Sequence, residues 1–148
     1  MTGRQIEILL VEDNPGDARL TLEALTESSI GKKGLTVVQD GVEALAFLHR
    51  EGKYARAPRP DLILLDLNMP KMNGQAVLAE IKKDEVLKSI PVVVFTTSQS
   101  EDDVYRCYDL RANSYVTKPM DFDGFMATVK CIHSYWLETT TLPTACFS

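Results

Sequence analysis

The chain has 148 residues, of which 45% are hydrophobic and 25% charged, as is usual for a single globular domain with its own core. A formal net charge of −5 argues against non-specific binding to nucleic acid, which depends on clustered lysine and arginine. No apolar run reaches the length of a membrane span, and residues 1–5 lack the apolar centre of a signal peptide. We therefore expect a cytoplasmic protein that binds neither nucleic acid nor membrane.

Five strand-like segments alternate with five helix-like segments along the chain. The strands are expected at residues 6–11, 36–39, 62–66, 92–96 and 114–117, and the helices at 15–27, 42–50, 75–83, 101–110 and 122–136. Asn14 before Pro15 is typical of a helix start, and so is Ser100 three residues before Asp103. This alternation predicts an α/β fold with a parallel sheet and right-handed crossovers. Residues 30–34 and 53–60 are expected to be surface loops.

Carboxylates follow two of the apolar runs at the point where each run ends. Glu12 and Asp13 come after residues 6–11, and Asp66 comes after residues 62–65. The carboxyl ends of parallel strands meet at one edge of the sheet, where open α/β folds bind their ligands. An acidic pocket there is costly unless a cation neutralises it or a proton is retained, and hard oxygen ligands favour Mg²⁺. A carboxylate beside Mg²⁺ can also accept a phosphoryl group.

The cysteines and histidines show no comparable pattern. Cys107, Cys131 and Cys146 are odd in number and widely spaced, which indicates neither a zinc site nor a disulfide framework. We expect reduced thiols, with Cys107 and Cys131 packed within helices. His49 and His133 have no acidic or cysteine partners at useful spacing, so we expect them at the surface or rim.

Further along the chain, Thr96 ends the fourth predicted strand, and Lys118 with Pro119 follows the fifth. Taken singly, each site residue has a structural explanation, such as a helix cap for Asp13 or a solvated charge for Lys118. Together, at the ends of successive strands and accompanied by Met69-Pro70, Gly74 and Tyr115, they resemble the response-regulator receiver domain of two-component signalling. The resemblance covers residues 5–138 and leaves a tail at 139–148. It implies a flavodoxin-like, doubly wound (βα)5 fold with strand order 2-1-3-4-5.

Three finer motifs resemble the stand-alone receivers that partner phytochrome-type histidine kinases. They are Val11 to Asp17, Asp40 to Leu45, and Thr96-Thr97-Ser98, and the late Tyr135-Trp136-Leu137 supports the same subgroup. The implied function is that of a single-domain response regulator that accepts a phosphoryl group from a sensor histidine kinase. It would act as a phosphorylation-gated interaction module with slow self-dephosphorylation rather than as an enzyme, and it would bind a downstream protein target.

The resemblance also implies a role for each matched residue. Asp66 would be the phosphoacceptor, and Mg²⁺ would be held by Glu12, Asp13, Asp66 and the backbone carbonyl of Asn68. Lys118 would contact a phosphoryl oxygen, and the Lys118–Pro119 bond would be cis. Thr96 would bond to the phosphoryl group, and Tyr115 would then rotate inward as the second switch residue.

Other classes fit the sequence less well. A phosphohydrolase of the haloacid-dehalogenase type places a second Asp two residues after the nucleophile, where this chain has Asn68. A flavodoxin-like cofactor binder needs a phosphate-cradling loop after the first strand, where Glu12 and Asp13 would repel a phosphate. A transcription factor needs an appended DNA-binding domain, for which no residues remain.

The end of the chain predicts a dimer. The last helix carries an apolar stripe at three- and four-residue steps, comprising Phe122, Phe125, Met126, Val129, Ile132 and Trp136. Leu142, Pro143 and Phe147 follow in the tail, so the tail either folds back on its own domain or packs on a second copy. We expect a two-fold homodimer through the fourth helix, fifth strand, fifth helix and tail.

Overall fold

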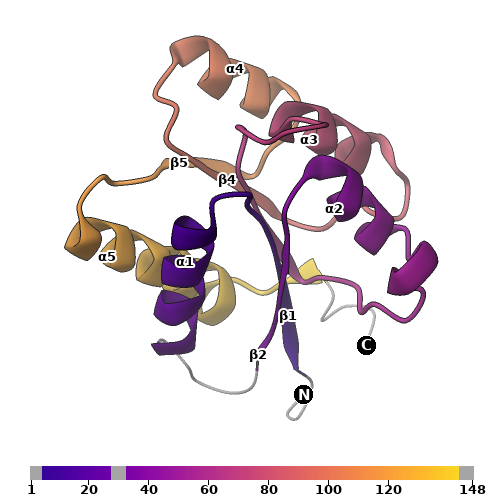
Figure 1. The fold of residues 1–148 in the computed structure, drawn as a ribbon, viewed down its shortest axis with the longest axis horizontal. Coiled ribbons are helices and arrows are strands. Elements are labelled where there is room, and N and C mark those ends of the chain that lie inside the picture. Colours follow the sequence, from indigo (N-terminus) through magenta and orange to yellow (C-terminus); the bar gives the residue numbers. More distant parts are fainter. Residues whose placement is uncertain (1–4, 28–32, 144–148) are drawn as a thin grey trace.

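The computed structural model describes residues 5–27 and 33–143, in which a five-stranded sheet lies between two layers of helices (Figure 1). The strands are β1 (Ile6–Val11), β2 (Lys33–Val38), β3 (Leu62–Leu65), β4 (Val92–Thr96) and β5 (Ser114–Thr117). They lie in the order β2-β1-β3-β4-β5, and every neighbouring pair is parallel. The predicted α/β fold and its strand order are confirmed.

Four helices connect consecutive strands and a fifth follows the last strand, and they begin directly after their capping residues. They are α1 (Pro15–Glu27), α2 (Gly41–Leu48), α3 (Gly74–Lys83), α4 (Glu101–Asp109) and α5 (Phe122–His133), with a short 3-10 turn at Gly52–Tyr54. The side chain of Asn14 accepts a hydrogen bond from the backbone N–H of Asp17 at 3.0 Å. The Ser100 hydroxyl accepts from the N–H of Asp103 at 3.3 Å. Both predicted helix starts are therefore confirmed.

The core has two halves, one on each face of the sheet. Leu62 and Leu64 of β3 pack with α1 and α5, whereas Ile63 and Leu65 pack with α2, α3 and α4. All four residues of β3 are buried, as expected for a central parallel strand covered on both faces. This burial fixes the position of the residue that follows the strand, which is Asp66.

The last helix begins at Phe122 as predicted but ends before the predicted residue 136. α5 ends at His133, and π-helical turns follow at Ser134–Thr139, so the predicted domain boundary at 138 falls within them. Phe122 is 59% exposed and does not join the buried stripe, because it lies on the first turn, ahead of the buried residues. The buried part of the stripe comprises Phe125, Met126, Val129 and Ile132. Leu142 is buried, so the described part of the tail folds back on its own domain, while Phe147 lies outside the described residues.

Several smaller expectations were wrong. β2 begins at Lys33 because its pairing with β1 extends back to Ile6, so part of the predicted loop at 30–34 is strand. His133 is buried, whereas Cys131 is exposed on the outer side of α5. Cys107 is buried as predicted, and Cys146 lies outside the described residues. Within residues 5–27 and 33–143, no helix is long and apolar enough to cross a membrane.

Candidate functional site

The register of the sheet brings the first two acidic positions together. Val11, the last residue of β1, pairs with Leu65, the last residue of β3, so Glu12 and Asp66 follow at the same level. The backbone N–H of Asp66 donates to the carbonyl of Val11 at 3.0 Å. Neighbouring parallel strands lie about 4.8 Å apart, so the two carboxylates share one edge of the sheet as predicted.

The other half of the site comes from β4 and β5. Thr96 pairs with Thr117 at the ends of these strands, and the N–H of Lys118 donates to the carbonyl of Thr96 at 2.7 Å. Thr96 and Lys118 are both buried. Lys118 therefore enters the site from the residue directly after β5, and its side chain reaches back toward the carboxylates.

Glu12, Asp13 and Asp66 form a compact cluster of oxygen donors. Each offers a carboxylate oxygen, and these three atoms lie within 4.8 Å of one another. Glu12 and Asp66 are 2% and 6% exposed, whereas Asp13 is the most accessible of the three. Carboxylate oxygens at this spacing, open to solvent on one side, fit a hard divalent cation that retains some of its water. Asn68 lies two residues beyond Asp66, and its side chain is exposed.

Lys118 is surrounded by three carboxylates. Its Nζ donates to Oε1 of Glu12 at 2.6 Å and to Oδ2 of Asp17 at 2.9 Å. Oδ2 of Asp66 lies 3.7 Å away, which is an ion-pair distance but too long for a hydrogen bond. The lysine is therefore bonded to two of its neighbours and faces the third.

The charges in the site are not balanced. Burial raises the pKa of Glu12 to about 7, and the nearby charge of Asp66 adds to that rise, although the hydrogen bond from Lys118 opposes it. Burial by itself would lower the pKa of Lys118, but its hydrogen bonds with Asp17 and Glu12 outweigh this effect and raise the pKa. The site thus holds one ammonium group and four carboxyl groups, those of Glu12, Asp13, Asp17 and Asp66, and the excess negative charge favours binding a cation.

Gly74 allows α3 to begin directly against the site. A Cβ added at this position would lie 2.2 Å from the carbonyl oxygen of Asp66 and 2.8 Å from the Cα of Leu67. The N–H of Gly74 donates to the Leu67 carbonyl at 3.0 Å, which closes the turn between β3 and α3. Only glycine fits here without moving the backbone of Asp66.

The two predicted switch residues, Thr96 and Tyr115, are joined through Ser98. The Tyr115 hydroxyl donates to the Ser98 carbonyl at 2.9 Å, and the Ser98 N–H lies 3.5 Å from the Thr96 hydroxyl. Ser98 also donates through its hydroxyl to Asp103 of α4 at 2.5 Å, and Gln75 of α3 donates to the same carboxylate at 3.0 Å. A displacement of Thr96 would therefore reach β5, α3 and α4 through hydrogen bonds.

The predicted cis bond is absent. Every peptide bond of the described residues is trans, including Lys118–Pro119, so that expectation was wrong for this structure. The bond before a proline favours trans by only about 0.5–1 kcal/mol, so sequence alone does not determine the isomer.

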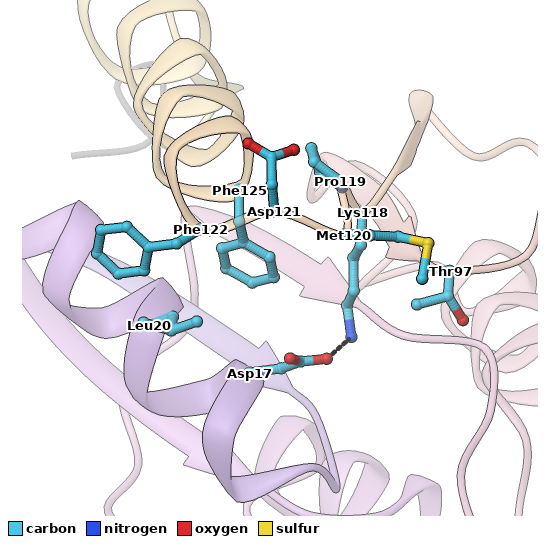
Figure 2. A pocket seen from close by; sticks show the side chains of 9 residues that line it. All are labelled: Asp17, Leu20, Thr97, Lys118, Pro119, Met120, Asp121, Phe122 and Phe125. Atoms are coloured by element: carbon cyan, nitrogen blue, oxygen red, sulfur yellow. Dashed lines mark hydrogen bonds and ion pairs between the residues drawn. The ribbon is translucent and has the colours of Figure 1, made fainter.

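Asp17 is the site residue that the sequence analysis did not single out. It lies on the first turn of α1 and bonds to Lys118, and the two side chains meet beside a cavity of about 340 Å³ (Figure 2). Its position four residues after Asp13, at the start of a helix, could have placed it over the same sheet edge. The sequence contains that signal, but acids in first turns are too common for it to stand out.

The chain is similar to known proteins over most of its length. The family described as "Response regulator receiver domain" matches residues 8–130. The chain is 52% identical over 138 residues to response regulator Rcp1 of Synechocystis sp., with 93% of both sequences covered. The crystal structure of the phosphorylated cyanobacterial phytochrome response regulator RcpA superposes with a TM-score of 0.92, at 52% identity over 95% of this chain and 99% of that one. The Mn²⁺-bound form of Rcp1 gives 0.90, at 51% identity over 93% and 99%.

Proposed function

The chain belongs to the response regulator receiver domain family, and from that premise we propose that it accepts a phosphoryl group from a sensor histidine kinase onto Asp66. The observation that carries the proposal is the meeting of Asp66 with Glu12, Asp13 and Lys118 at the carboxyl end of β3. Because RcpA is described as a phytochrome response regulator, we further propose a phytochrome-type kinase as the donor.

The transfer itself needs little from the protein beyond a nucleophile and compensation of charge. An oxygen of the Asp66 carboxylate attacks phosphorus and forms the new O–P bond while the N–P bond of the phosphohistidine breaks. The electron pair of that bond returns to the imidazole nitrogen. Lys118 lies where it can donate to a phosphoryl oxygen, and the hydroxyl of Thr96 can donate to another.

The divalent cation is proposed to be Mg²⁺, held by Glu12, Asp13, Asp66 and the backbone carbonyl of Asn68. The donor set is all oxygen, which suits Mg²⁺, and the related Rcp1 has been crystallised with Mn²⁺. When bound, the ion offsets the negative charge of the phosphoryl oxygens during transfer and during slow self-dephosphorylation.

The output is proposed to pass through the hydrogen bonds between Thr96, Ser98 and Tyr115. Movement of Thr96 toward a phosphoryl oxygen displaces Ser98, whose carbonyl accepts from the Tyr115 hydroxyl. Tyr115 then settles further inward, which changes the surface of α4, β5 and α5 that a downstream protein target reads.

The same surface is proposed to form a homodimer. Tyr105 of α4 is 74% exposed, and an apolar hollow of about 430 Å³ beside β5 and α5 is lined by Val116, Ile132 and Trp136, among others. Substituting Tyr105→Arg should weaken dimers in sedimentation at tens of micromolar, whereas Val86→Arg, at a similarly exposed valine outside this surface, should not. Monomeric wild-type protein, with and without a phosphate mimic, contradicts the dimer.

The central test is labelling of Asp66. Asp66→Asn should abolish acid-labile phosphate incorporation from a kinase or acetyl phosphate, because an amide is not a competent nucleophile. Asp61→Asn is the matched control, since Asp61 is equally buried at the other end of the same strand. Full stoichiometric labelling of Asp66→Asn would refute the assignment of the phosphoacceptor.

A further inference from the structure

The contact between Asp17 and Lys118 has no place in the transfer described above. Asp17 lies on α1 and Lys118 follows β5, 101 positions later in the chain. Their side chains meet at 2.9 Å, and Figure 2 shows Lys118 extending from its loop toward the first turn of α1. This contact links the helix that follows the acidic pair to the lysine proposed to hold the phosphoryl group.

The backbone of Asp17 is held firmly on both sides. Its N–H donates to Oδ1 of Asn14 at 3.0 Å, and its carbonyl accepts from the hydroxyl of Thr21 at 2.7 Å. The Asp17 side chain is 28% exposed, compared with 3% for Lys118. The Asp17 carboxylate is thus an acceptor on a well-anchored backbone, partly open to solvent, and the buried ammonium group of Lys118 donates to it.

The hydrogen-bonding capacity of Lys118 shows what this acceptor does. A lysine ammonium has three N–H donors and no acceptor. Glu12 takes one at 2.6 Å and Asp17 takes a second at 2.9 Å, while Asp66 lies beyond bonding distance at 3.7 Å. One N–H of Lys118 therefore remains without a bond to Glu12 or Asp17, and the third carboxylate beside the ammonium is that of Asp66.

We propose that Asp17 is a positioning residue for phosphoryl transfer: together with Glu12 it anchors Lys118 so that the third N–H of the ammonium faces the phosphoryl group on Asp66. This inference rests on the proposed function, because it needs Asp66 to be the phosphoacceptor. It adds a residue that contacts neither the nucleophile nor the phosphoryl group and acts only through Lys118. Charge-assisted hydrogen bonds of this kind are strong enough to orient a flexible side chain.

Two simpler roles for Asp17 make different predictions. If it only stabilises the start of α1 as a first-turn acid, its loss lowers the melting temperature and leaves the kinetics unchanged. If it only adds negative charge, its loss lowers the half-saturating concentration of an anionic phosphodonor and leaves the maximal rate unchanged. Positioning of Lys118 is the role that predicts a lower maximal rate.

The experiment measures phosphorylation of the full chain by acetyl phosphate, with Mg²⁺ present, as a function of donor concentration. Asp17→Ala should lower the maximal rate about tenfold, less than the hundredfold loss that a full 1 Å misplacement can cause. Asp17→Asn keeps an acceptor oxygen for Lys118 and should restore most of that rate. Glu27→Ala is the matched control, since it breaks a carboxylate–lysine pair on the same helix, with Lys130 at 3.0 Å, away from the site.

A second measurement tests whether the effect passes through Lys118. In a Lys118→Ala background, Asp17→Ala should change the residual rate by less than about twofold, because coupled residues are non-additive. An undiminished loss in that background, equal losses in the Ala and Asn variants, or an unchanged or higher maximal rate in Asp17→Ala would each overturn the inference. Unlabelled wild-type protein would instead count against the proposed function, which separates the two failures.

Discussion

Two lysines lie at opposite ends of the strands of the sheet, Lys118 buried and Lys82 half-buried, and their ammonium groups donate hydrogen bonds to different kinds of oxygen. At the carboxyl end, Nζ of Lys118 bonds to the carboxylates of Glu12 and Asp17. At the amino end, Nζ of Lys82 donates to the backbone carbonyls of Lys88 and Ile90 and to the side-chain oxygen of Asn113, at 3.0–3.1 Å.

The difference shows in the proton affinity of the two groups. Burial lowers the pKa of Lys82, because its hydrogen-bond acceptors are neutral and do not make up for lost hydration. The carboxylates raise the pKa of Lys118 despite its burial. Lys82 uses all three donors to join α3 to the starts of β4 and β5, whereas Lys118 keeps one donor for a ligand. We infer that Lys82 serves the fold and Lys118 serves the chemistry.

Loss of Lys118 is expected to have the largest effect. Lys118→Ala should lower the rate of labelling by acetyl phosphate by about a hundredfold or more, the cost of removing a charged donor from a transferring group. The protein should still fold, because Glu12 can take up a proton readily with its pKa already at about 7. The measurement is the initial rate of labelling by acetyl phosphate in each variant. An equal loss of rate in Lys82→Ala would contradict the distinction between the two lysines.

Mg²⁺ should stabilise the protein only by binding at the carboxyl edge of the sheet, where Asp13 lies. An ion that binds only the native state at a hundred times its dissociation constant adds about 2.7 kcal/mol to the free energy of unfolding. Asp13→Asn should remove most of this gain, whereas Lys82→Ala should keep it. Thermal unfolding with Mg²⁺ and with a chelator measures both. A gain that survives in Asp13→Asn would place the ion elsewhere.

Loss of Lys82 should lower the stability of the fold, whereas loss of Lys118 should lower the rate of phosphoryl transfer. Lys82→Ala leaves three oxygens without their donor and should cost about 2 kcal/mol of unfolding free energy. Lys83→Ala is the matched control, because that neighbour is exposed and pairs only with Glu80, for a loss of about 0.5 kcal/mol or less. Urea unfolding measures the loss of unfolding free energy in both variants. Equal small losses would mean that water replaces the hydrogen bonds of Lys82 without cost.

The same contrast explains which residues the sequence could reveal. Asp66 and Lys118 were predictable because each directly follows a strand, and parallel strands end at one edge of the sheet. Asp17 and Lys82 depend instead on where a helix turn meets a distant loop. Lys82 contacts residues 6, 8 and 31 positions away, and no periodicity encodes those distances.

The helix faces show a similar limit. Spacing predicted the buried residues of α5 from Phe125 to Ile132, but it also placed Phe122 on the stripe, although Phe122 is 59% exposed at the edge of the cavity that it lines with Leu20 of α1 (Figure 2). Spacing by itself would have placed His133 on the buried face, four residues after Val129, and Cys131 off that face, as the structure has them. The expectation of a rim histidine came instead from its lack of acidic or cysteine partners in the sequence. Strand ends were thus predictable from local pattern, whereas the margins of helices depended on tertiary packing.

The smallest expected effect is the contribution of Lys82 to the pH dependence of stability. Burial lowers the pKa of Lys82 in the folded protein below 10.5, the usual pKa of a lysine in an unfolded chain. Between those two values the unfolded state binds more protons, so stability rises with pH in that window. The free energy of unfolding of wild type minus that of Lys82→Met should therefore grow as the pH rises toward 10.5. Taking the difference between the two proteins cancels the other groups that titrate in this range. A flat or falling difference would mean that the carbonyl oxygens compensate the buried ammonium fully, and the two lysines would then differ in position but not in electrostatics.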